Sequence, residues 1–267
     1  MTDNRQSTGP EDQLSFDHAV IVVPDLETAI LNFQTLGFQV QRGGVSGPTH
    51  NALIYFRDGT YIELITPIRR SARIVFRGLH AAGLLGLIAR RQRGIMARFL
   101  MWFGTPAGLR DWCVRCVSLD RTIERLRELG IETSDAKNFS RKRPDGQVAK
   151  WRLAGPLNTH LPFLIEDVSP TQIRVPFEGH CDHPNGVTGI SALVLSGERQ
   201  LASIQILQRL VSGNVMAGSA CTIGTVAIRS VAGNNSPVGL ALELSSNAEV
   251  KGPLARDKTF GAQITIS

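Results

Sequence analysis

The chain has 267 residues, 42% of them hydrophobic and 19% charged, which is enough to bury a substantial core in one or two domains. Its formal net charge of +6 favours an anionic partner only where that charge is clustered. The sequence lacks an apolar run near the roughly 20 residues of a membrane span, lacks a secretory signal pattern and has only four cysteines, so we expect a cytoplasmic protein with reduced thiols.

The first folded segment predicts a β-α-β-β-β unit. A strand rich in β-branched residues runs over 16–23, and Pro24 opens an amphipathic helix that Gly37 ends. Three short strands then follow, at 38–41, 51–56 and 61–66.

The positive charge is concentrated in the segment that comes next, where the sequence has no acidic residue between Glu63 and Asp111. Nine arginines lie there: Arg69, Arg70, Arg73, Arg77, Arg90, Arg91, Arg93, Arg98 and Arg110. Leucines and aromatic residues alternate with them, which predicts helices whose guanidinium groups reach solvent. We expect a lid over a ligand site; a helix on an acidic membrane surface and a dimer contact are the alternatives. The segment has no aromatic stacking platform and no motif that would favour nucleic acid.

The sequence repeats itself at a shift of 93 residues. Residues 118–133 then lie over 25–40, with Leu119 on Leu26, Gly130 on Gly37 and two further matches between apolar residues. Strands at 147–153 and 161–166 complete a second β-α-β-β-β unit, after a turn at Pro144-Asp145-Gly146. A looser third copy begins at Gly189.

This organisation predicts an α+β fold built from two β-α-β-β-β modules, with a degenerate third module. Five segments are expected: a flexible tail at 1–14, the first module at 15–67, a basic helical insertion at 68–109, the second module at 110–168, and a loop with a third partial module at 169–267.

Four stretches occur in an order that resembles the vicinal oxygen chelate superfamily, in its glyoxalase-like domain branch. They are FDHAVIVVPDLETA, THNALIYFRDGTYIELI, SRKRPDGQVAKWRLAGP and HPNGVTGI, and they cover roughly residues 15 to 195. The resemblance implies that the paired β-α-β-β-β modules form a cupped mixed sheet, which holds a divalent metal ion and a small-molecule substrate. It also implies a homodimer, because dimers are common in this fold.

The metal site predicted from these residues includes His18, Glu63 and Asp111. His18 is on the first strand and Glu63 on the last strand of the first module, where both can face the concave side of the sheet. An imidazole and a carboxylate suit Fe(II), Mn(II), Ni(II) or Zn(II) equally well, and a site without metal is the alternative. The 93-residue shift places Asp111 where His18 stands, but it places Phe163, which has no ligand atom, near the counterpart of Glu63.

Other candidate site residues follow from their chemistry. We assign acid–base roles to Glu63, His50 and His160, and substrate contacts to Arg69, Arg70 and Trp151. The Cys113-Val-Arg-Cys116 pattern is not expected to bind metal, because residues i and i+3 of a strand face opposite sides. The His180-Cys181-Asp182-His183 stretch is expected to be a loop.

The leading hypothesis is a glyoxalase-like enzyme that binds a small oxygenated, anionic substrate and carries out metal-dependent lyase, isomerase or dioxygenase chemistry. A protein that sequesters a drug without chemistry is the first alternative. A membrane-surface protein that uses the arginine-rich insertion is the second.

Overall fold

The computed structural model describes residues 13–92, 95–143, 145–156, 158, 160–197, 200–215, 218–231, 239–249 and 251–267. Most of the expected flexible tail at 1–14 lies outside these described residues, and so do Pro144 of the expected turn and Arg93 of the insertion.

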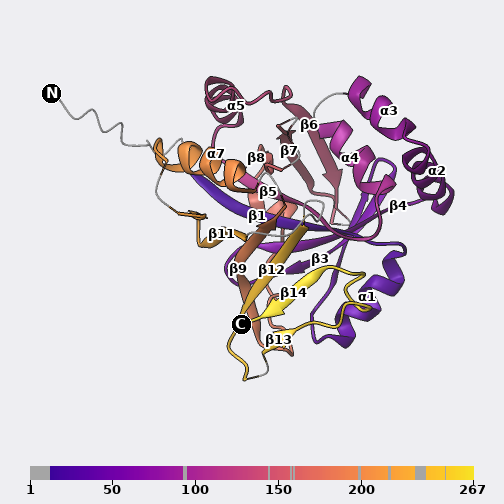
Figure 1. Ribbon diagram of the computed structural model, residues 1–267. Coiled ribbons are helices and arrows are strands. Elements are labelled where there is room, and N and C mark those ends of the chain that lie inside the picture. The colour runs from indigo at the N-terminus through magenta and orange to yellow at the C-terminus, as the bar shows by residue number, and fades with distance from the viewer. Residues whose placement is uncertain are drawn as a thin grey trace.

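Two β-α-β-β-β modules form one eight-stranded mixed sheet, which confirms the predicted fold class (Figure 1). The first module consists of β1 (Leu14–Val22), α1 (Leu26–Thr35), β2 (Gln41–Ser46), β3 (Thr49–Tyr55) and β4 (Tyr61–Pro67). The second consists of β5 (Gly108–Cys116), α5 (Leu119–Glu128), β6 (Lys137–Lys142), β7 (Val148–Ala154) and β8 (Phe163–Asp167). The strand order is β2-β3-β4-β1-β5-β8-β7-β6, so the two modules join at the antiparallel pair β1–β5.

The strand register reproduces the 93-residue repeat. On the β1–β5 ladder His18 lies opposite Cys113, and Val20 lies opposite Asp111. The 93-residue shift maps His18 to Asp111 and Val20 to Cys113, so it converts each of these pairs into the other. Two modules related by a two-fold axis show this behaviour. In the parallel ladders Val20 pairs with Glu63 and its counterpart Cys113 pairs with Phe163, so Phe163 occupies the ladder position of Glu63 although it lies 100 residues further along the chain.

Helix α1 shows how the local sequence builds a module. Asp25 caps its first turn by accepting a hydrogen bond from the backbone N–H of Thr28 at 3.0 Å. The apolar side buries Leu26, Ala29, Ile30 and Phe33 against the sheet. Gly37 then leaves the helix with φ +83°, a conformation that favours glycine.

The strand expected at 38–41 begins only at Gln41. Phe38 is buried in the core, in contact with Phe33 and Phe56, and the backbone N–H of Gln39 donates to Nδ1 of His183 instead of to a neighbouring strand. Residues 38–40 therefore do not form the expected strand, because they contact a loop that is distant in the sequence.

The C-terminal segment forms a second, six-stranded sheet of order β10-β11-β9-β12-β14-β13. Its elements are β9 (Val187–Ser196), α7 (Gln200–Ser212), β10 (Ala220–Ile223), β11 (Val226–Val231), β12 (Gly239–Ser246), β13 (Gly252–Pro253) and β14 (Gln263–Ile266). As in the large sheet, the central pair β9–β12 is antiparallel and each partner has a parallel neighbour. This segment thus repeats the modular pattern in shortened form.

The main core lies between the convex side of the large sheet and the second sheet, together with α1, α5 and α7. It contains Trp112, Leu193 and Ile264, from three different strands. A second apolar cluster lies on the concave side of the large sheet, under the helices of the insertion.

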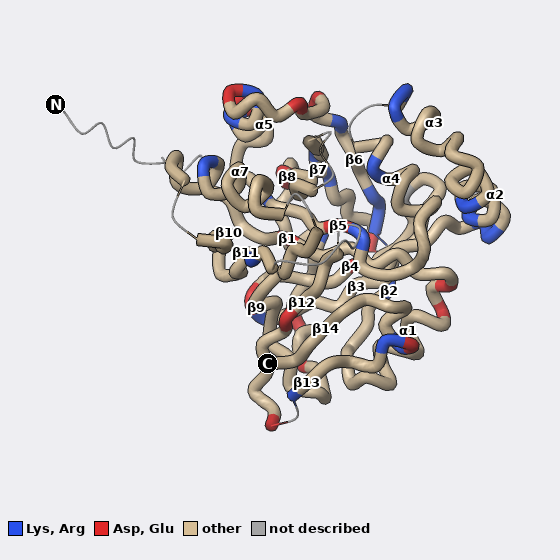
Figure 2. Tube along the Cα trace, in the orientation of Figure 1, with Lys and Arg blue, Asp and Glu red and all other residues tan. Residues whose placement is uncertain are grey.

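The insertion forms three helices on the concave side: α2 (Arg70–Ala81), α3 (Leu84–Gln92) and α4 (Ile95–Gly104). Figure 2 shows arginines along α2 and α3 at one end of the molecule, away from the second sheet. Among the described residues, no single helix is long and apolar enough to cross a membrane; α2 and α3 meet the length and composition only as a pair, and they are bent by 107°.

The exit from α1 gives a test of this packing. We expect Gly37→Ala to lower the free energy of unfolding by about 3 kcal/mol, because positive φ costs alanine about 1 kcal/mol and the new Cβ meets a crowded backbone. That Cβ would lie 2.9 Å from Cβ and 3.1 Å from the backbone N of Asn185.

Gly130, the repeat counterpart of Gly37, provides the matched control. It has φ +75°, and a Cβ there meets nothing within 4 Å, so Gly130→Ala is expected to cost only about 1 kcal/mol. Urea denaturation measures both variants, and equal losses would show that the contact with Asn185 adds nothing.

Candidate functional site

A cavity of about 500 Å³ lies in the cup of the large sheet, beneath the insertion. Its wall is mostly apolar and is formed by strands of both modules together with residues of α2 and α4. The edge strands β2 and β6 approach each other, so the sheet nearly closes around this space. A cavity of this size accommodates a small organic molecule.

His18 and Glu63 meet in the wall of this cavity. The parallel ladder places Tyr61 beside His18 and Glu63 beside Val20, so the two functional side chains lie on the same face of adjacent strands. Nε2 of His18 is 3.6 Å from Oε2 of Glu63. Glu63 accepts a hydrogen bond from Nδ2 of Asn51 through its other oxygen, which orients the carboxylate.

Asp17 fixes the orientation of the His18 ring. Its Oδ1 lies 2.7 Å from Nδ1 of His18, and both side chains are buried. Burial opposes ionisation of Asp17, but the charge of Arg174 and the hydrogen bond from His18 outweigh it and hold the pKa of Asp17 far below 3.8. Because an ionised carboxylate only accepts hydrogen bonds, Nδ1 of His18 carries a proton and Nε2 is directed toward Glu63.

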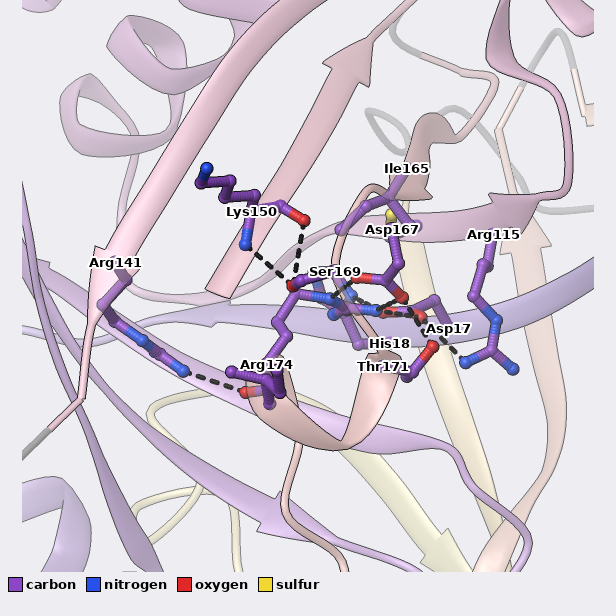
Figure 3. Close-up of polar contacts among 12 residues, drawn as sticks. Asp17, His18, Arg115, Arg141, Lys150, Ile165, Asp167, Ser169, Thr171 and Arg174 are labelled. Carbon is purple, nitrogen blue, oxygen red and sulfur yellow. Dashed lines mark hydrogen bonds and ion pairs between the residues drawn. The ribbon is translucent and has the colours of Figure 1, made fainter. Parts of the chain in front are cut away.

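Arg174 neutralises this buried carboxylate (Figure 3). It is the last residue of the short helix α6 (Thr171–Arg174), and its guanidinium group donates to both oxygens of Asp17, at 3.1 and 2.9 Å. It also donates to Asp167 and, at 2.7 Å, to the hydroxyl of Tyr61. Arg174 is thus a buried cation between two carboxylates, which balances the charge that orients His18.

Aromatic rings hold the imidazole of His18 in place. It stacks on Tyr61, with centroids 4.5 Å apart and an angle of 18° between planes. The ring of Phe163 contacts the imidazole in an edge-to-face arrangement, with centroids 5.4 Å apart and an angle of 74° between planes. Together with Asp17, these contacts leave His18 little freedom to turn.

Asp111, the predicted third ligand, has other partners. Arg98 of α4 donates to both of its oxygens, through Nε at 2.9 Å and through Nη2, and Trp102 donates to Oδ2 through Nε1 at 2.9 Å. All three residues are buried. The insertion therefore pairs Arg98 with Asp111, the residue that corresponds to His18 under the 93-residue shift.

Of the three predicted metal ligands, the two from the first module keep donor atoms that a metal ion could use. His18 and Glu63 fit: an N and an O donor 3.6 Å apart, with the second ring nitrogen of the histidine held by a carboxylate, is the usual arrangement at a histidine-ligated metal. In the second module Phe163 offers no donor, and both oxygens of Asp111 are engaged by Arg98.

A second group of donor atoms, from Asp17, His18 and Cys113, also lies close together, within 4.8 Å. Burial raises the pKa of the Cys113 thiol well above 9.0, and Asp17 is already paired with Arg174. A metal ion here would have to displace the guanidinium group and deprotonate the thiol, so this group fits a metal poorly.

The other predicted site residues differ in position. Trp151 lines the cavity, whereas His50, His160, Arg69 and Arg70 do not. His50 alternates with the cavity-lining Thr49 and Asn51 on β3, and the backbone N–H of His160 donates to the side chain of Asn158. Arg69 is exposed at the start of α2, and Arg70 pairs with Asp25 at 2.8 Å.

The two motifs that contain cysteine and histidine, at 113–116 and 180–183, have structural roles. Cys113 faces the concave side of the sheet and Cys116 the convex core, as strand alternation predicts. His183 links two segments, since Nδ1 accepts from the N–H of Gln39 at 2.9 Å and Nε2 lies 2.8 Å from the carbonyl of Tyr55. Burial lowers the pKa of His183, which keeps it neutral in that role.

Comparisons with known proteins agree with this geometry. A family model described as "Glyoxalase-like domain" matches residues 16–211. A hypothetical protein from Staphylococcus aureus has a similar structure, with a TM-score of 0.69 and 13% identity over 95% of this chain and 99% of the other. Methylmalonyl-CoA epimerase from Mycobacterium tuberculosis is also found, with a TM-score of 0.39 and 18% identity over 63% of this chain and 97% of the other. At 13% identity the likeness to the Staphylococcus aureus protein concerns the fold alone. No curated protein matches the chain.

The Arg98–Asp111 pair gives a testable prediction. We expect Arg98→Met to lower the free energy of unfolding by about 3–5 kcal/mol, because it leaves the carboxylate of Asp111 buried with only Trp102 and a backbone N–H as partners. The double variant Arg98→Met/Asp111→Leu removes the stranded charge and should recover much of that loss. Urea denaturation of the single and double variants checks this, and additive losses would contradict the coupling.

Proposed function

Because the chain belongs to the glyoxalase-like domain family, we propose that its cavity binds a small oxygenated ligand with an apolar body and that His18 and Glu63 act on it. The observation that carries this proposal is the His18–Glu63 pair, 3.6 Å apart, in the wall of an otherwise mostly apolar cavity. Polar groups that converge in an apolar pocket are the usual mark of a ligand site.

His18 and Glu63 are also the residues that would hold a divalent metal ion. A metal bound there supplies Lewis-acid polarisation of the ligand's oxygen atoms. Fe(II), Mn(II), Ni(II) and Zn(II) all suit this pair of donors.

The chain's own residues support proton transfer next to a carbonyl group, the step shared by isomerases and lyases that pass through an enediolate. Glu63 is the proposed base: Asn51 holds one oxygen and leaves Oε2 toward His18 and the cavity. Asp17 and Arg174 keep the His18 ring fixed, so a proton or an oxygen of the ligand meets Nε2 in one orientation. Oxidative ring cleavage of a catechol is the rival chemistry.

Replacing the central pair tests the proposal. We expect His18→Ala and Glu63→Gln each to abolish near-stoichiometric metal binding, measured by elemental analysis after reconstitution with each of the four metals, since the first removes the nitrogen donor and the second replaces the charged carboxylate with a weakly ligating neutral amide. Both variants should also lose turnover of any active compound found among α-ketoaldehydes and catechols.

His50→Ala is the matched control, because that histidine is on β3 but does not line the cavity. Metal retained in His18→Ala would contradict the assignment of donors. A wild-type protein that binds no metal and turns over none of these compounds would favour the alternative of a non-catalytic, ligand-sequestering protein.

The insertion supports a second proposed role, association with an anionic membrane surface. Exposed apolar side chains on α2 and α3 stand among exposed arginines: Ile74, Val75, Leu84, Leu87 and Ile88 with Arg77, Arg90 and Arg91. Phe76 of α2 lines the cavity from the same helix, so this surface adjoins the ligand site. A helix pair with this composition is suited to the interface of a bilayer.

We expect the protein to sediment with vesicles that contain phosphatidylserine and not with pure phosphatidylcholine. Arg90→Gln/Arg91→Gln should weaken this binding roughly tenfold or more, since each basic residue near such a surface contributes about 1 kcal/mol. Lys137→Gln/Lys142→Gln removes the same charge from exposed positions of β6 and should have little effect. Unchanged binding in the arginine variant would remove this role.

The same helices could instead meet those of a second copy in the homodimer that the family resemblance implies. Analytical ultracentrifugation of the wild-type protein distinguishes a monomer from this dimer.

A further inference from the structure

We propose that Arg141 is the anion-binding residue of the cavity and that the ligand carries an oxyanion group beside its apolar body. This inference names the substrate class of the site described above and rests on the proposed function. The predicted anion-binding arginines, Arg69 and Arg70, lie outside the cavity, whereas Arg141 and Arg174 line it.

The guanidinium group of Arg141 is held at the polar end of the cavity. It extends from β6, and Nη2 donates to the backbone carbonyl of Arg174 at 2.9 Å, as Figure 3 shows. Arg174 in turn contacts Asp17 and Tyr61, which hold His18. Arg141 is therefore one residue removed from the network around the reactive pair.

The charge of Arg141 has no protein counter-ion. None of the ion pairs formed by the described residues includes it, and its Nε is buried without a hydrogen-bond partner. The other guanidinium groups nearby are compensated: Arg174 pairs with Asp17 and Asp167, and Arg143 pairs with Asp145. Arg141 thus differs from Arg174, the other arginine of the cavity wall, in having a charge that no carboxylate balances.

Such a group favours an anion for two reasons. A partly desolvated cation without a partner costs free energy that an oxyanion relieves, and the planar guanidinium offers donors spaced for a carboxylate or phosphate. Because Nε is buried without a protein partner, a small shift of the Arg141 side chain that brings Nε to a ligand oxygen gains a hydrogen bond at Nε without breaking one there.

The walls next to Arg141 define the rest of the ligand. Phe139, two residues earlier on the same face of β6, stacks parallel to Trp151, with centroids 6.3 Å apart and 11° between planes. Phe99 of α4 meets Phe139 edge-on at 6.3 Å. These three rings suit an apolar, preferably aromatic, body, while the anionic head lies at Arg141 and further oxygen atoms reach toward His18 and Glu63.

A matched pair of fluorescent probes tests this inference. 8-Anilinonaphthalene-1-sulfonate has an aromatic body and an anionic head, and N-phenyl-1-naphthylamine has the same body without the charge. We expect Arg141→Gln to weaken binding of the sulfonate about tenfold to a hundredfold, the range of a charge-assisted hydrogen bond, and to leave binding of the neutral probe within about twofold.

Three variants complete the experiment. Arg141→Lys keeps the charge and should retain part of the preference for the anion; Lys142→Gln removes the adjacent exposed cation and should change neither affinity. Trp151→Ala should weaken both probes, which places them in the cavity. Displacement of the sulfonate probe by decanoate or by decyl phosphate, with decanol as the neutral comparison, then distinguishes a carboxylate head from a phosphate head.

Loss of both probes to the same extent in Arg141→Gln, no loss of either, or no binding of the sulfonate by the wild-type protein would each overturn the inference. The chemistry proposed for His18 and Glu63 can fail while the inference about Arg141 holds, and the two failures give different results. In that case the charge-dependent binding at Arg141 persists, while His18→Ala and Glu63→Gln change neither metal content nor turnover.

Discussion

The buried ion pair between Asp17 and Arg174 is the interaction on which the site depends. It keeps Asp17 ionised, although burial alone would favour the neutral acid, and the ionised Asp17 holds the proton of His18 on Nδ1. Nε2 is thereby directed at Glu63, whatever that pair binds. Arg174 comes from a four-residue helix that follows the second module, so the orientation of a side chain on the first strand requires this distant segment to be in place. Site and fold are coupled through one guanidinium group.

The insertion breaks the two-fold symmetry of the paired modules. Asp111 is the counterpart of His18 by the 93-residue shift, and Phe163 occupies the ladder position of Glu63. His18 and Glu63 line the cavity; in the second module Phe163 also lines it, but Asp111 does not, because α4 places Arg98 on its carboxylate. Arg98 neutralises Asp111, and its guanidinium lies 5.8 Å from the centroid of the Phe163 ring. One module therefore retains side chains that could act on a ligand, while the other anchors the helices that cover it. Under the proposed function, the reactive pair belongs to the first module.

Much of the fold was accessible from the sequence, because apolar periodicity and the 93-residue shift are local or linear signals. The pair of His18 and Glu63 was predicted for the same reason. Asp17 and Arg174 were not, since strand alternation predicts that Asp17 faces away from His18. A shift in the β1–β5 register between Phe16 and His18 brings it to the ring instead. Arg98 was visible only as one of nine arginines, and nothing in its spacing distinguishes it from those that reach solvent.

The most direct test of this account is the tautomer of His18, observed by NMR in protein with ¹⁵N-labelled histidine and assigned with the variant His18→Gln. We predict that Nδ1 carries the proton of the neutral His18 ring in the metal-free protein, and that Zn(II) or a bound ligand shifts the resonance of Nε2. In Asp17→Asn this preference should weaken, because the neutral amide no longer requires a donor. A proton on Nε2 in the wild-type protein, with Nδ1 unprotonated, would contradict the central role assigned to Asp17 and Arg174.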